Sequence, residues 1–379
     1  MNTDHIDWMT QSVNQAQKLH PYVPGKPVQQ LLREQGLDEL QIEQQVSQTI
    51  KLASNENPYG VPPQAVQAMQ DAASEVHRYP DGDCFALKQA LASEHGVETS
   101  QLLVGNGSNE VLELIIRCFA GVGDEVVYSQ RGFIVYALAT TAAGATAVAV
   151  PEADGLTHDL KAMAAAVQAN TKVICLANPN NPTGSLLATD ALQTFLDGLP
   201  RHVVVILDEA YYEYVQDDIS DSIHALNHPG LIVSRTFSKA YGLAGCRVGY
   251  AVADSDLLAV VNRFREPFNV NSLAQAGAVG ALRDKEWLLE KVAACKKERL
   301  RLEDGLLERG CFMAKSYANF VLLQHEKSLD ICQRLEDKGV IVRPLAPYGM
   351  ADVLRVSVGN FDENTAFLSA LDDVLAELP

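Results

Sequence analysis

The chain has 379 residues, of which 47% are hydrophobic and 21% are charged, and it carries a formal net charge of -18. This length allows about two domains of ordinary globular composition. The acidic charge argues against a nucleic-acid-binding protein, which needs a basic surface. It also requires that any anionic ligand be held by local cations or backbone N–H groups.

The seven cysteines show no CxxC spacing and their number is odd, so we expect reduced thiols rather than a disulfide framework or a metal site. The N-terminal residues are polar and acidic, unlike a signal peptide. No apolar run approaches the ~20 residues of a membrane span. These features predict a cytoplasmic protein with neither a membrane partner nor a nucleic-acid partner.

The N-terminal region, residues 1–50, is expected to form an arm and a surface helix that pack with a smaller domain or with a dimer partner. Three prolines in the segment 21–27 favour an extended chain, and a glutamine-rich helix is expected over 28–48. Apolar residues at helical spacing predict further helices over 63–76 and 83–95.

From about residue 101 the pattern changes to short apolar runs that alternate with longer helical segments. Such alternation is typical of an α/β fold whose seven-stranded, mostly parallel sheet is flanked by helices. We predict a large domain over 51–270 and a smaller α+β domain over 271–379. The strands of the large domain are expected over 101–104, 125–128, 145–150, 172–176, 203–207, 231–234 and 247–252. Those of the smaller domain are expected over 318–324, 340–343 and 353–358.

Four of these strands end in polar segments, and ligands of such folds collect where strands end and helices begin. The first segment, 105–110, has glycines before a helix start, which suits an anion. It is not a GxGxxG motif, because its sixth residue is Glu110, and an ordinary capped helix explains it equally well. The second segment, 178–184, is a rigid turn whose adjacent asparagines, Asn180 and Asn181, are not explained by turn chemistry.

The third and fourth segments carry the charged candidates. Asp208 ends a buried run, where a carboxylate needs a cationic partner, either a protonated ring nitrogen or one of the arginines Arg235 and Arg247. Lys239 lies in a stretch, 231–253, that contains no acidic residue but includes the cations Arg235 and Arg247, so we expect a cationic pocket around it. Burial and cationic neighbours lower the pKa of a lysine and make it a nucleophile able to form a Schiff base. A solvated loop lysine is the alternative.

Two further groups of residues suit anions. Thr236, Ser238 and Arg247 are placed to hold a phosphate beside the lysine. Arg343 and Arg355 each end or interrupt an apolar run near the C-terminus. In a chain this acidic they form either an anion clamp or two structural salt bridges.

Taken together, these motifs resemble the class I/II aminotransferases, the fold type I pyridoxal-phosphate enzymes. The matching set is Gly107-Ser108-Asn109-Glu110, Asn181-Pro182-Thr183-Gly184, Asp208-Glu209-Ala210-Tyr211 and Ser238-Lys239, with Arg247 and Arg355. This ordered set covers nearly the whole chain. Within that family, the segments 21–27, 54–60 and 354–359 look like those of the histidinol-phosphate aminotransferases.

The resemblance implies a role for each matching residue. Lys239 would form the Schiff base with pyridoxal phosphate and then move a proton, and Asp208 would pair with the ring nitrogen. Asn181 and Tyr211 would hydrogen-bond the ring oxygen. The other implied cofactor residues are Phe133, which would stack on the ring, and Gly107, Ser108, Asn109, Thr236, Ser238, Arg247 and Tyr59 around the phosphate. The implied substrate residues are Tyr22, Asn57, Arg343 and Arg355.

The implied assembly is an obligate homodimer with shared active sites, in which Tyr59 reaches the phosphate of the other subunit. The implied reaction is transamination between histidinol phosphate and 2-oxoglutarate in histidine biosynthesis. One arginine fork would accept either the phosphate of histidinol phosphate or the carboxylate of glutamate.

Other functions remain open at this point. An aromatic amino-acid aminotransferase shares the cofactor motifs, and a phospho-amino-acid decarboxylase shares the scaffold. A nicotinamide dehydrogenase is disfavoured by the missing GxGxxG, and a non-catalytic binding protein would not need Lys239 and Asp208 together. The chain departs from the family at Gln130-Arg131-Gly132, where Pro-Thr often precedes the equivalent of Phe133. Arg235 has no evident role.

Overall fold

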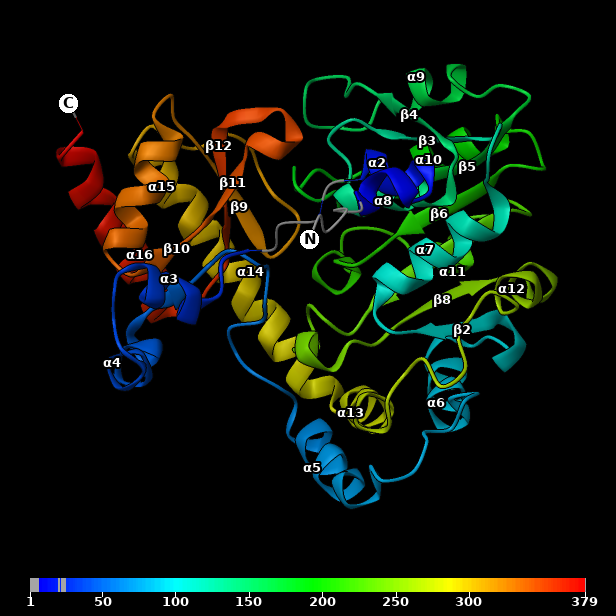
Figure 1. Ribbon diagram of the computed structural model, residues 1–379, viewed down its shortest axis with the longest axis horizontal. Coiled ribbons are helices and arrows are strands. Elements are labelled where there is room, and N and C mark those ends of the chain that lie inside the picture. The colour runs from blue at the N-terminus through cyan, green and yellow to red at the C-terminus, as the bar shows by residue number, and fades with distance from the viewer. Residues whose placement is uncertain (1–6, 20, 22–24, 379) are drawn as a thin grey trace, which may run out of the picture.

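The computed structural model describes residues 7–19, 21 and 25–378, and Figure 1 shows two groups of elements. One group surrounds a seven-stranded sheet, and the other surrounds smaller sheets of two and three strands. The long helix α14 (Lys285–Glu308) runs from one group to the other (Figure 1). In the part of the chain that the structure describes, no helix is long and apolar enough to cross a membrane.

The seven-stranded sheet has the order β2-β8-β7-β6-β5-β3-β4. The neighbouring strands from β7 to β4 are parallel to one another, whereas β8 is antiparallel to both of its neighbours, β2 and β7. The predicted α/β class with a mostly parallel sheet is therefore confirmed. The strands are β2 (Leu102–Gly105), β3 (Glu125–Ser129), β4 (Thr146–Val150), β5 (Thr171–Ala177), β6 (Val204–Asp208), β7 (Leu231–Thr236) and β8 (Gly249–Ala253).

Both faces of this sheet are covered, which explains why its central strands are continuous apolar runs. Alternate residues of β5 show this arrangement, because Val173 and Cys175 pack into one apolar cluster while Ile174 and Leu176 pack into another. The first cluster includes side chains of α7 (Ser108–Phe119), α8 (Ile134–Ala143) and α12 (Ser255–Val261). The second includes side chains of α9 (Leu160–Ala165) and α10 (Thr189–Asp197).

A helical layer lies beside the β2 edge of the sheet. Its helices are α5 (Pro63–Ala72), α6 (Phe85–His95) and α13 (Ser272–Arg283). Helix α13 packs against α5 and α6. Gly280 permits the close approach to α5, since a Cβ there would lie 2.5 Å from the carbonyl oxygen of Gln64.

The second group of elements contains an antiparallel sheet of order β11-β12-β9 and a parallel pair of β1 with β10. The expected strand over 340–343 is two strands, because β10 and β11 join different sheets. The strands are β1 (Ile50–Lys51), β9 (Phe320–Gln324), β10 (Val340–Ile341), β11 (Arg343–Leu345) and β12 (Met350–Ser357). The helices are α3 (Val28–Glu34), α4 (Glu39–Gln45), α15 (Ser328–Asp337) and α16 (Phe361–Ala376).

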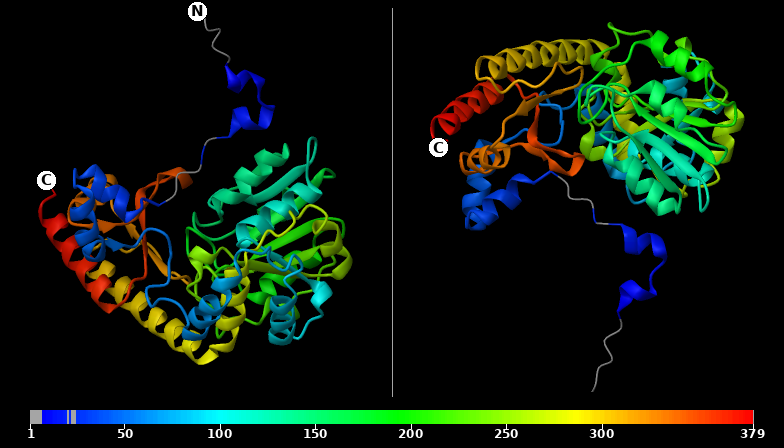
Figure 2. Two further views of the ribbon diagram at one scale, coloured as in Figure 1. Left: turned by 60° about the horizontal axis from the view of Figure 1, so that its bottom comes forward. Right: turned by 90° about the horizontal axis from the view of Figure 1, so that it is seen from above.

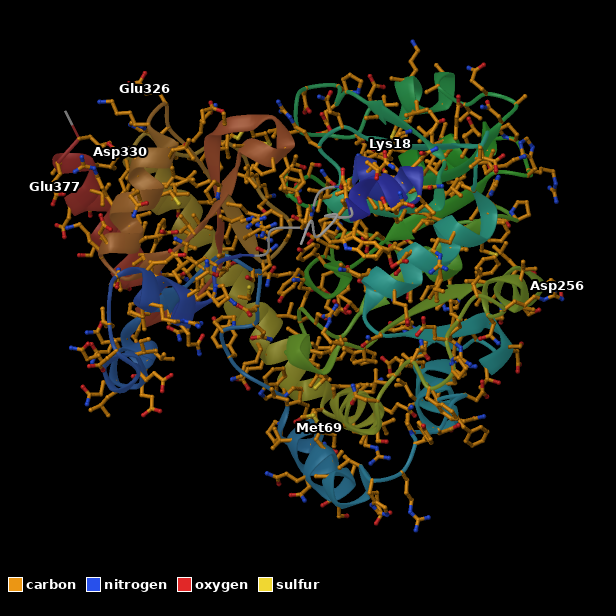
Figure 3. All side chains as sticks on the ribbon, in the orientation of Figure 1. Lys18, Met69, Asp256, Glu326, Asp330 and Glu377 are labelled. Carbon is orange, nitrogen blue, oxygen red and sulfur yellow. The ribbon has the colours of Figure 1, made fainter. Side chains whose placement is uncertain are left out.

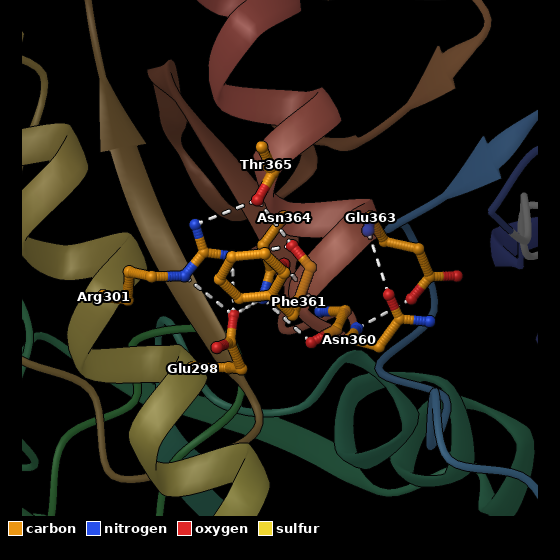
Figure 4. A network of polar contacts seen from close by, with 8 residues as sticks. Glu298, Arg301, Asn360, Phe361, Glu363, Asn364 and Thr365 are labelled. Carbon is orange, nitrogen blue, oxygen red and sulfur yellow. Dashed lines mark hydrogen bonds and ion pairs between the residues drawn. The ribbon is translucent and has the colours of Figure 1, made fainter.

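A polar network joins α14 to the start of α16 (Figure 4). The Glu298 carboxylate accepts hydrogen bonds from Arg301 at 2.7 Å and from Asn364 at 3.0 Å. The Asn364 side chain also bonds both backbone groups of Gly359, at 2.9 Å each. This network fixes the turn that follows β12, the strand that carries Arg355.

The N-terminal helices α1 (Trp8–Gln11) and α2 (Asn14–Lys18) stand out from the rest of the chain in both views of Figure 2. Helix α2 contacts α8, where Gln15 lies against Gly144. Lys18 in the last turn of α2 is labelled in Figure 3. The remaining short elements are η1 (Val46–Gln48), η2 (Ala73–Glu75), η3 (Thr99–Gln101), η4 (Tyr212–Tyr214), α11 (Ser222–Ala225), η5 (Ala244–Cys246) and η6 (Ala346–Tyr348).

Candidate active site

A cavity of about 340 Å³ lies at the carboxyl ends of the central strands and is closed on one side by the second group of elements. Most of the residues singled out from the sequence line it. They are Ser108, Asn109, Phe133, Asn181, Asp208, Tyr211, Thr236, Ser238, Lys239, Arg247, Arg343 and Arg355. The cavity therefore brings together residues that lie almost 250 positions apart in the chain.

Lys239 lies in the loop that follows β7, with its side chain in this cavity. Its Nζ donates a hydrogen bond to the carbonyl oxygen of Ser54 at 3.2 Å and lies 6.0 Å from the centre of the Tyr211 ring. Burial, helped by the positive charge of Arg355, lowers the pKa of Lys239 to about 8. At mildly alkaline pH a large share of this amine is neutral and nucleophilic.

Asp208 ends β6 and is only 4% exposed. Its Oδ2 accepts a hydrogen bond from the Tyr136 hydroxyl at 2.9 Å, whereas its buried Oδ1 has no partner among the described residues. Burial raises the pKa of Asp208 to about 6. A buried carboxylate oxygen without a hydrogen-bond partner is costly, and a cationic N–H group of a ligand would supply the missing partner.

Neither arginine that was considered as a partner for Asp208 has that role. Arg235 is on β7 between Ser234 and Thr236, so its side chain lies on the other face of the sheet from Thr236. It pairs with Glu209 at 2.7 Å and with Asp221 at 2.6 Å, and its guanidinium lies 3.5 Å from the centre of the Tyr212 ring. The expectation that Arg235 adds to a cationic pocket around Lys239 is wrong, because strand alternation turns it away.

The anion end of the cavity is formed at the start of α7. No side chain caps this helix, so its first backbone N–H groups remain available to a ligand. Gly107 has a φ of 82°, and a Cβ there would lie 2.6 Å from the Arg247 guanidinium. Arg247 in turn donates to the Ser238 hydroxyl at 3.2 Å. Helix dipole, hydroxyls and guanidinium converge here on a space suited to a phosphate.

Glu110, which breaks the GxGxxG pattern, does not face this space. Its carboxylate accepts hydrogen bonds from the backbone N–H of Asn106 and from the Asn269 side chain, both at 2.6 Å. Gly249 of β8 allows the helix start to approach, because a Cβ there would lie 2.5 Å from the backbone nitrogen of Ser108.

Two hydrogen-bond donors face the middle of the cavity. Asn181 uses its Oδ1 to accept from Arg355 at 2.6 Å, which leaves its amide N–H groups to donate. The Tyr211 hydroxyl accepts from the Asn55 side chain at 2.8 Å, which leaves its own proton to donate. Both groups therefore suit a ligand oxygen that carries negative charge.

Arg343 and Arg355 are paired in register across β11 and β12, so both reach the same side of the cavity. Arg355 donates to Asn181 and, at 3.1 Å, to the carbonyl oxygen of Ala53, and its guanidinium lies 5.4 Å from the centre of the Phe320 ring. The oxygens of Asn181 and Ala53 belong to neutral groups, and these two contacts hold the guanidinium in place.

Three further sequence-derived residues, Asn57, Tyr59 and Gly107, do not line the cavity. Asn57 donates to the Ala240 carbonyl oxygen at 2.8 Å, and Tyr59 lies over Lys291, whose Nζ is 5.9 Å from the centre of its ring. Gly107 contributes by making room for Arg247 rather than by contact. Tyr22 lies outside the described residues.

The departure at Gln130-Arg131-Gly132 has a structural account. The backbone N–H of Arg131 donates to Glu152, and its guanidinium donates to the Gly155 carbonyl oxygen. Gly132 is required by space, since a Cβ there would lie 2.8 Å from the Ser129 carbonyl oxygen. These contacts hold the turn in place, and Phe133 lines the cavity directly after it.

Sequence reasoning missed Tyr136, Ser54, Asn55 and Tyr348. Tyr136 lies three residues after Phe133, and this helical spacing is a signal that could have found it. Asn55 has a left-handed backbone with a φ of 54°, and it lies in a segment dense in polar groups. Ser54 acts through its carbonyl oxygen, which no side-chain pattern reveals. Within the described residues, no cluster of histidine, cysteine and acidic side chains could hold a metal ion.

Comparison with known proteins agrees with this geometry. The profile of the family described as aminotransferase class I and II matches residues 47–371. Histidinol-phosphate aminotransferase 2 of Pseudomonas fluorescens is 48% identical over 95% of this chain and 96% of its own length. The histidinol-phosphate aminotransferase of Methylobacillus flagellatus is 47% identical over 94% of this chain and 95% of its own.

A solved structure is similar over the whole length of the chain. The histidinol-phosphate aminotransferase of Sinorhizobium meliloti, in complex with pyridoxal-5'-phosphate, superimposes with a TM-score of 0.87 and 29% identity over 99% of both chains. With a lysine, a buried aspartate and a phosphate-sized anion space in one cavity, this chain belongs to the class I and II aminotransferases and, among them, to the family of the histidinol-phosphate aminotransferases.

Proposed function

We propose that the protein transfers an amino group between L-histidinol phosphate and 2-oxoglutarate. In the biosynthetic direction it converts imidazole acetol phosphate and glutamate into L-histidinol phosphate and 2-oxoglutarate, a step of histidine biosynthesis. The observation that carries this proposal is the pair of arginines, Arg343 and Arg355, which lie side by side and line the same cavity as the phosphate space.

The cofactor is pyridoxal phosphate, and three features of the cavity fit it. The unpartnered Oδ1 of Asp208 suits the protonated ring nitrogen. The start of α7 with Arg247 suits the phosphate, and Lys239 is the amine that can link to the aldehyde. When bound, this cofactor supplies an electron sink for the negative charge that develops at the amino-bearing carbon.

The residues of the chain supply proton transfer and electrostatic control. In the first half-reaction the Nζ of Lys239 would remove the proton from the amino-bearing carbon of the donor and deliver it to the aldehyde carbon of the cofactor. In the second half-reaction it would move a proton in the opposite direction, to the carbon of the acceptor. A neutral Nζ is needed for that step, and burial provides it by lowering the pKa of Lys239 to about 8. The Asp208 carboxylate would hold the ring nitrogen in its cationic form, and Asn181 and Tyr211 would donate hydrogen bonds to the ring oxygen.

Both substrates use one anion site. Histidinol phosphate presents a phosphate where glutamate presents its α-carboxylate, and a planar arginine fork binds either group. We assign Arg355 to this contact, with Arg343 beside it. Tyr22 is proposed to complete the substrate site, whereas Asn57, which lies outside this cavity and donates to the Ala240 carbonyl oxygen, is not.

An aromatic amino-acid aminotransferase is the second candidate, because a cavity of about 440 Å³ adjoins the first. The two cavities share Phe133, Arg343 and Tyr348. Apolar residues of α8, Ile134, Ala137 and Leu138, line much of the second one. This apolar space fits an aromatic side chain as well as an imidazole ring.

The deciding experiment compares histidinol phosphate with phenylalanine as amino donors to 2-oxoglutarate. We expect kcat/KM to be at least about a hundredfold higher for histidinol phosphate, because the phosphate adds a charged contact that phenylalanine lacks. Higher kcat/KM with phenylalanine would replace this proposal with the aromatic aminotransferase. Release of carbon dioxide without any keto acid would instead indicate the phospho-amino-acid decarboxylase.

The proposed enzyme is a cytoplasmic homodimer with shared active sites. Its subunit is proposed to consist of the arm and surface helix over 1–50, a cofactor-binding domain over 51–270 and a small domain over 271–379. Support for the placement of this segment comes from β1, which begins at its last residue, Ile50, and pairs with β10.

A further inference from the structure

Tyr136 makes a hydrogen bond to Asp208, and none of the roles proposed above accounts for this bond. Its side chain is fully buried in the first turn of α8, and its hydroxyl donates to the Oδ2 of Asp208 at 2.9 Å. Burial raises the pKa of Tyr136 well above its ordinary value, so the hydroxyl keeps its proton and acts as a donor. The contact is thus a hydrogen bond from a neutral phenol to a buried carboxylate.

The two oxygens of Asp208 have different surroundings. Oδ2 is held by Tyr136, while Oδ1 is buried and has no partner among the described residues. The carboxylate lies at the floor of the cavity, between strands that hold its backbone on both sides. Since Oδ2 is anchored, rotation of the carboxylate is restricted, and Oδ1 is the oxygen that remains for a ligand.

The ring of Tyr136 is itself held firmly. It meets the Phe133 ring edge-on, with ring centres 5.9 Å apart, and lies 6.4 Å from the Tyr128 ring. Its backbone carbonyl accepts a hydrogen bond from the Thr140 hydroxyl at 2.7 Å. The start of α8 therefore presents both its N-cap residue, Phe133, to the cavity and the Tyr136 hydroxyl to Asp208.

We infer that Tyr136 is a positioning residue for the reaction, which keeps the Asp208 carboxylate ionised and turns its Oδ1 toward the ring nitrogen of the cofactor. This inference rests on the proposed pyridoxal-phosphate chemistry. A donor to a carboxylate lowers the basicity of that carboxylate. With Tyr136 in place the shared proton stays on the ring nitrogen, and without it the proton moves toward Asp208.

The test is a spectrophotometric pH titration of the holoenzyme without substrate, comparing wild type with Tyr136→Phe. A less protonated ring withdraws fewer electrons, so the Lys239 nitrogen linked to the cofactor becomes more basic. We expect the midpoint of the absorption change to rise by about one pH unit. We also expect kcat to fall about tenfold while KM for the amino donor changes less than about twofold.

The matched control is Tyr128→Phe, which removes a phenol hydroxyl from a neighbouring buried ring that does not contact Asp208. This variant should keep the wild-type midpoint. In the Asp208→Asn background, Tyr136→Phe should produce no further shift of the midpoint, because the group through which it acts is gone. Replacing Tyr136 with 3-fluorotyrosine, a stronger donor, should lower the midpoint, and this variant retains the native shape.

A Tyr136→Phe midpoint within about 0.2 unit of wild type, the resolution expected against a one-unit effect, would overturn the inference. So would an equal shift in Tyr128→Phe. Since no substrate is present in the titration, either result leaves the proposed amino donor untouched, whereas a wild-type protein that binds no pyridoxal phosphate would overturn both proposals.

Discussion

Glu213 is a buried acidic side chain that the active site does not use. It lies in the short helix η4, is 4% exposed, and its Oε2 has no hydrogen-bond partner within the described residues. Burial raises the pKa of Glu213 to about 7, although the charge of Arg235 opposes this shift. In the folded protein this carboxyl group therefore holds its proton at pH values where the unfolded chain has lost it.

This difference predicts a pH-dependent stability. Because the folded pKa of Glu213 is raised, the unfolded chain loses this proton first, and the free energy of unfolding decreases as the pH rises from about 4.5 to about 7. Glu213→Gln, which mimics the protonated form, should raise the free energy of unfolding by about 3 kcal/mol at pH 8 and by less than about 1 kcal/mol at pH 5.

Urea unfolding of the two proteins at both pH values measures this difference. The exposed Glu290→Gln provides a control for the loss of one charge, since its side chain is 70% exposed. An equal gain for Glu213→Gln at pH 5 and pH 8 would contradict the assignment.

At this scale the sequence identified the residues whose side-chain chemistry is unusual for their place. Lys239 and Asp208 follow buried apolar runs, and a charged residue in such a position can be recognised from the sequence alone. The Tyr136 hydroxyl and the Ser54 carbonyl were not visible, because their roles depend on which groups the fold places opposite them. The direction of Arg235 was also predictable, because it follows from strand alternation alone.

Strands β6 and β7 are joined by more than their ladder. Glu209 follows directly after Asp208, and its backbone N–H donates to the Ser234 carbonyl oxygen at 2.8 Å. Its carboxylate receives both Nε and Nη2 of Arg235, at 2.9 and 2.7 Å. Burial lowers the pKa of Arg235, but the charge of Glu209 outweighs this effect, so the pKa lies well above its ordinary value. The pair ties the end of β6 to the strand that leads to Lys239.

Removing one partner of this pair is expected to be costly. Arg235→Met leaves the buried Glu209 unpaired and should lower the free energy of unfolding by about 3–5 kcal/mol. Adding Glu209→Leu should restore most of that loss, because the double variant no longer contains the fully buried carboxylate, while Asp221 is partly exposed to water. Chemical denaturation of the apoproteins measures both effects. If the single and double variants were equally unstable, packing rather than charge would explain the loss.

The elements were largely predictable because buried parallel strands leave a clear sequence pattern. Each predicted strand of the large sheet overlaps an observed strand, with ends that differ by no more than two residues. The antiparallel direction of β8 was not predictable, since it depends on where the loop from 237 to 248 returns. The split of 340–343 into β10 and β11 was missed for the same reason: the two halves pair with strands far away in the chain.

On the whole molecule, large apolar side chains are exposed around the helical layer. Tyr79 is 83% exposed and stacks on Phe268, with ring centres 4.7 Å apart, and Phe85 is 61% exposed. Helices α1 and α2 also project from the body with Trp8 exposed (Figure 2). Exposed apolar groups of this kind support the proposed homodimer, in which a second copy covers them.

Shared active sites predict complementation between inactive subunits. Lys239→Ala removes the proton-transferring amine, and Tyr59→Phe removes the proposed cross-subunit phosphate contact. If Tyr59 serves the other subunit, a mixed dimer contains one complete site. After unfolding and refolding of an equimolar mixture, activity should reach about a quarter of wild type, since about half of the dimers are mixed. Activity no higher than the mean of the two separately refolded variants would show that each site uses its own Tyr59.

The cavity is closed by segments that lie far apart in the sequence, and this has a consequence for the order in which the site forms during synthesis. The Asn55 backbone N–H donates to the Ser357 hydroxyl at 2.8 Å, and Arg355 donates to the Ala53 carbonyl oxygen, contacts that each span 302 positions. During synthesis Ala53 and Asn55 leave the ribosome first, and they cannot make these contacts until almost the entire chain has been synthesised. The start of α7, Lys239 and Arg247 leave the ribosome well before Arg355. The nascent chain therefore gains its proposed cofactor-binding groups earlier than its proposed substrate-binding arginine. Completion of the catalyst is therefore a late event in biogenesis, coupled to the docking of β12.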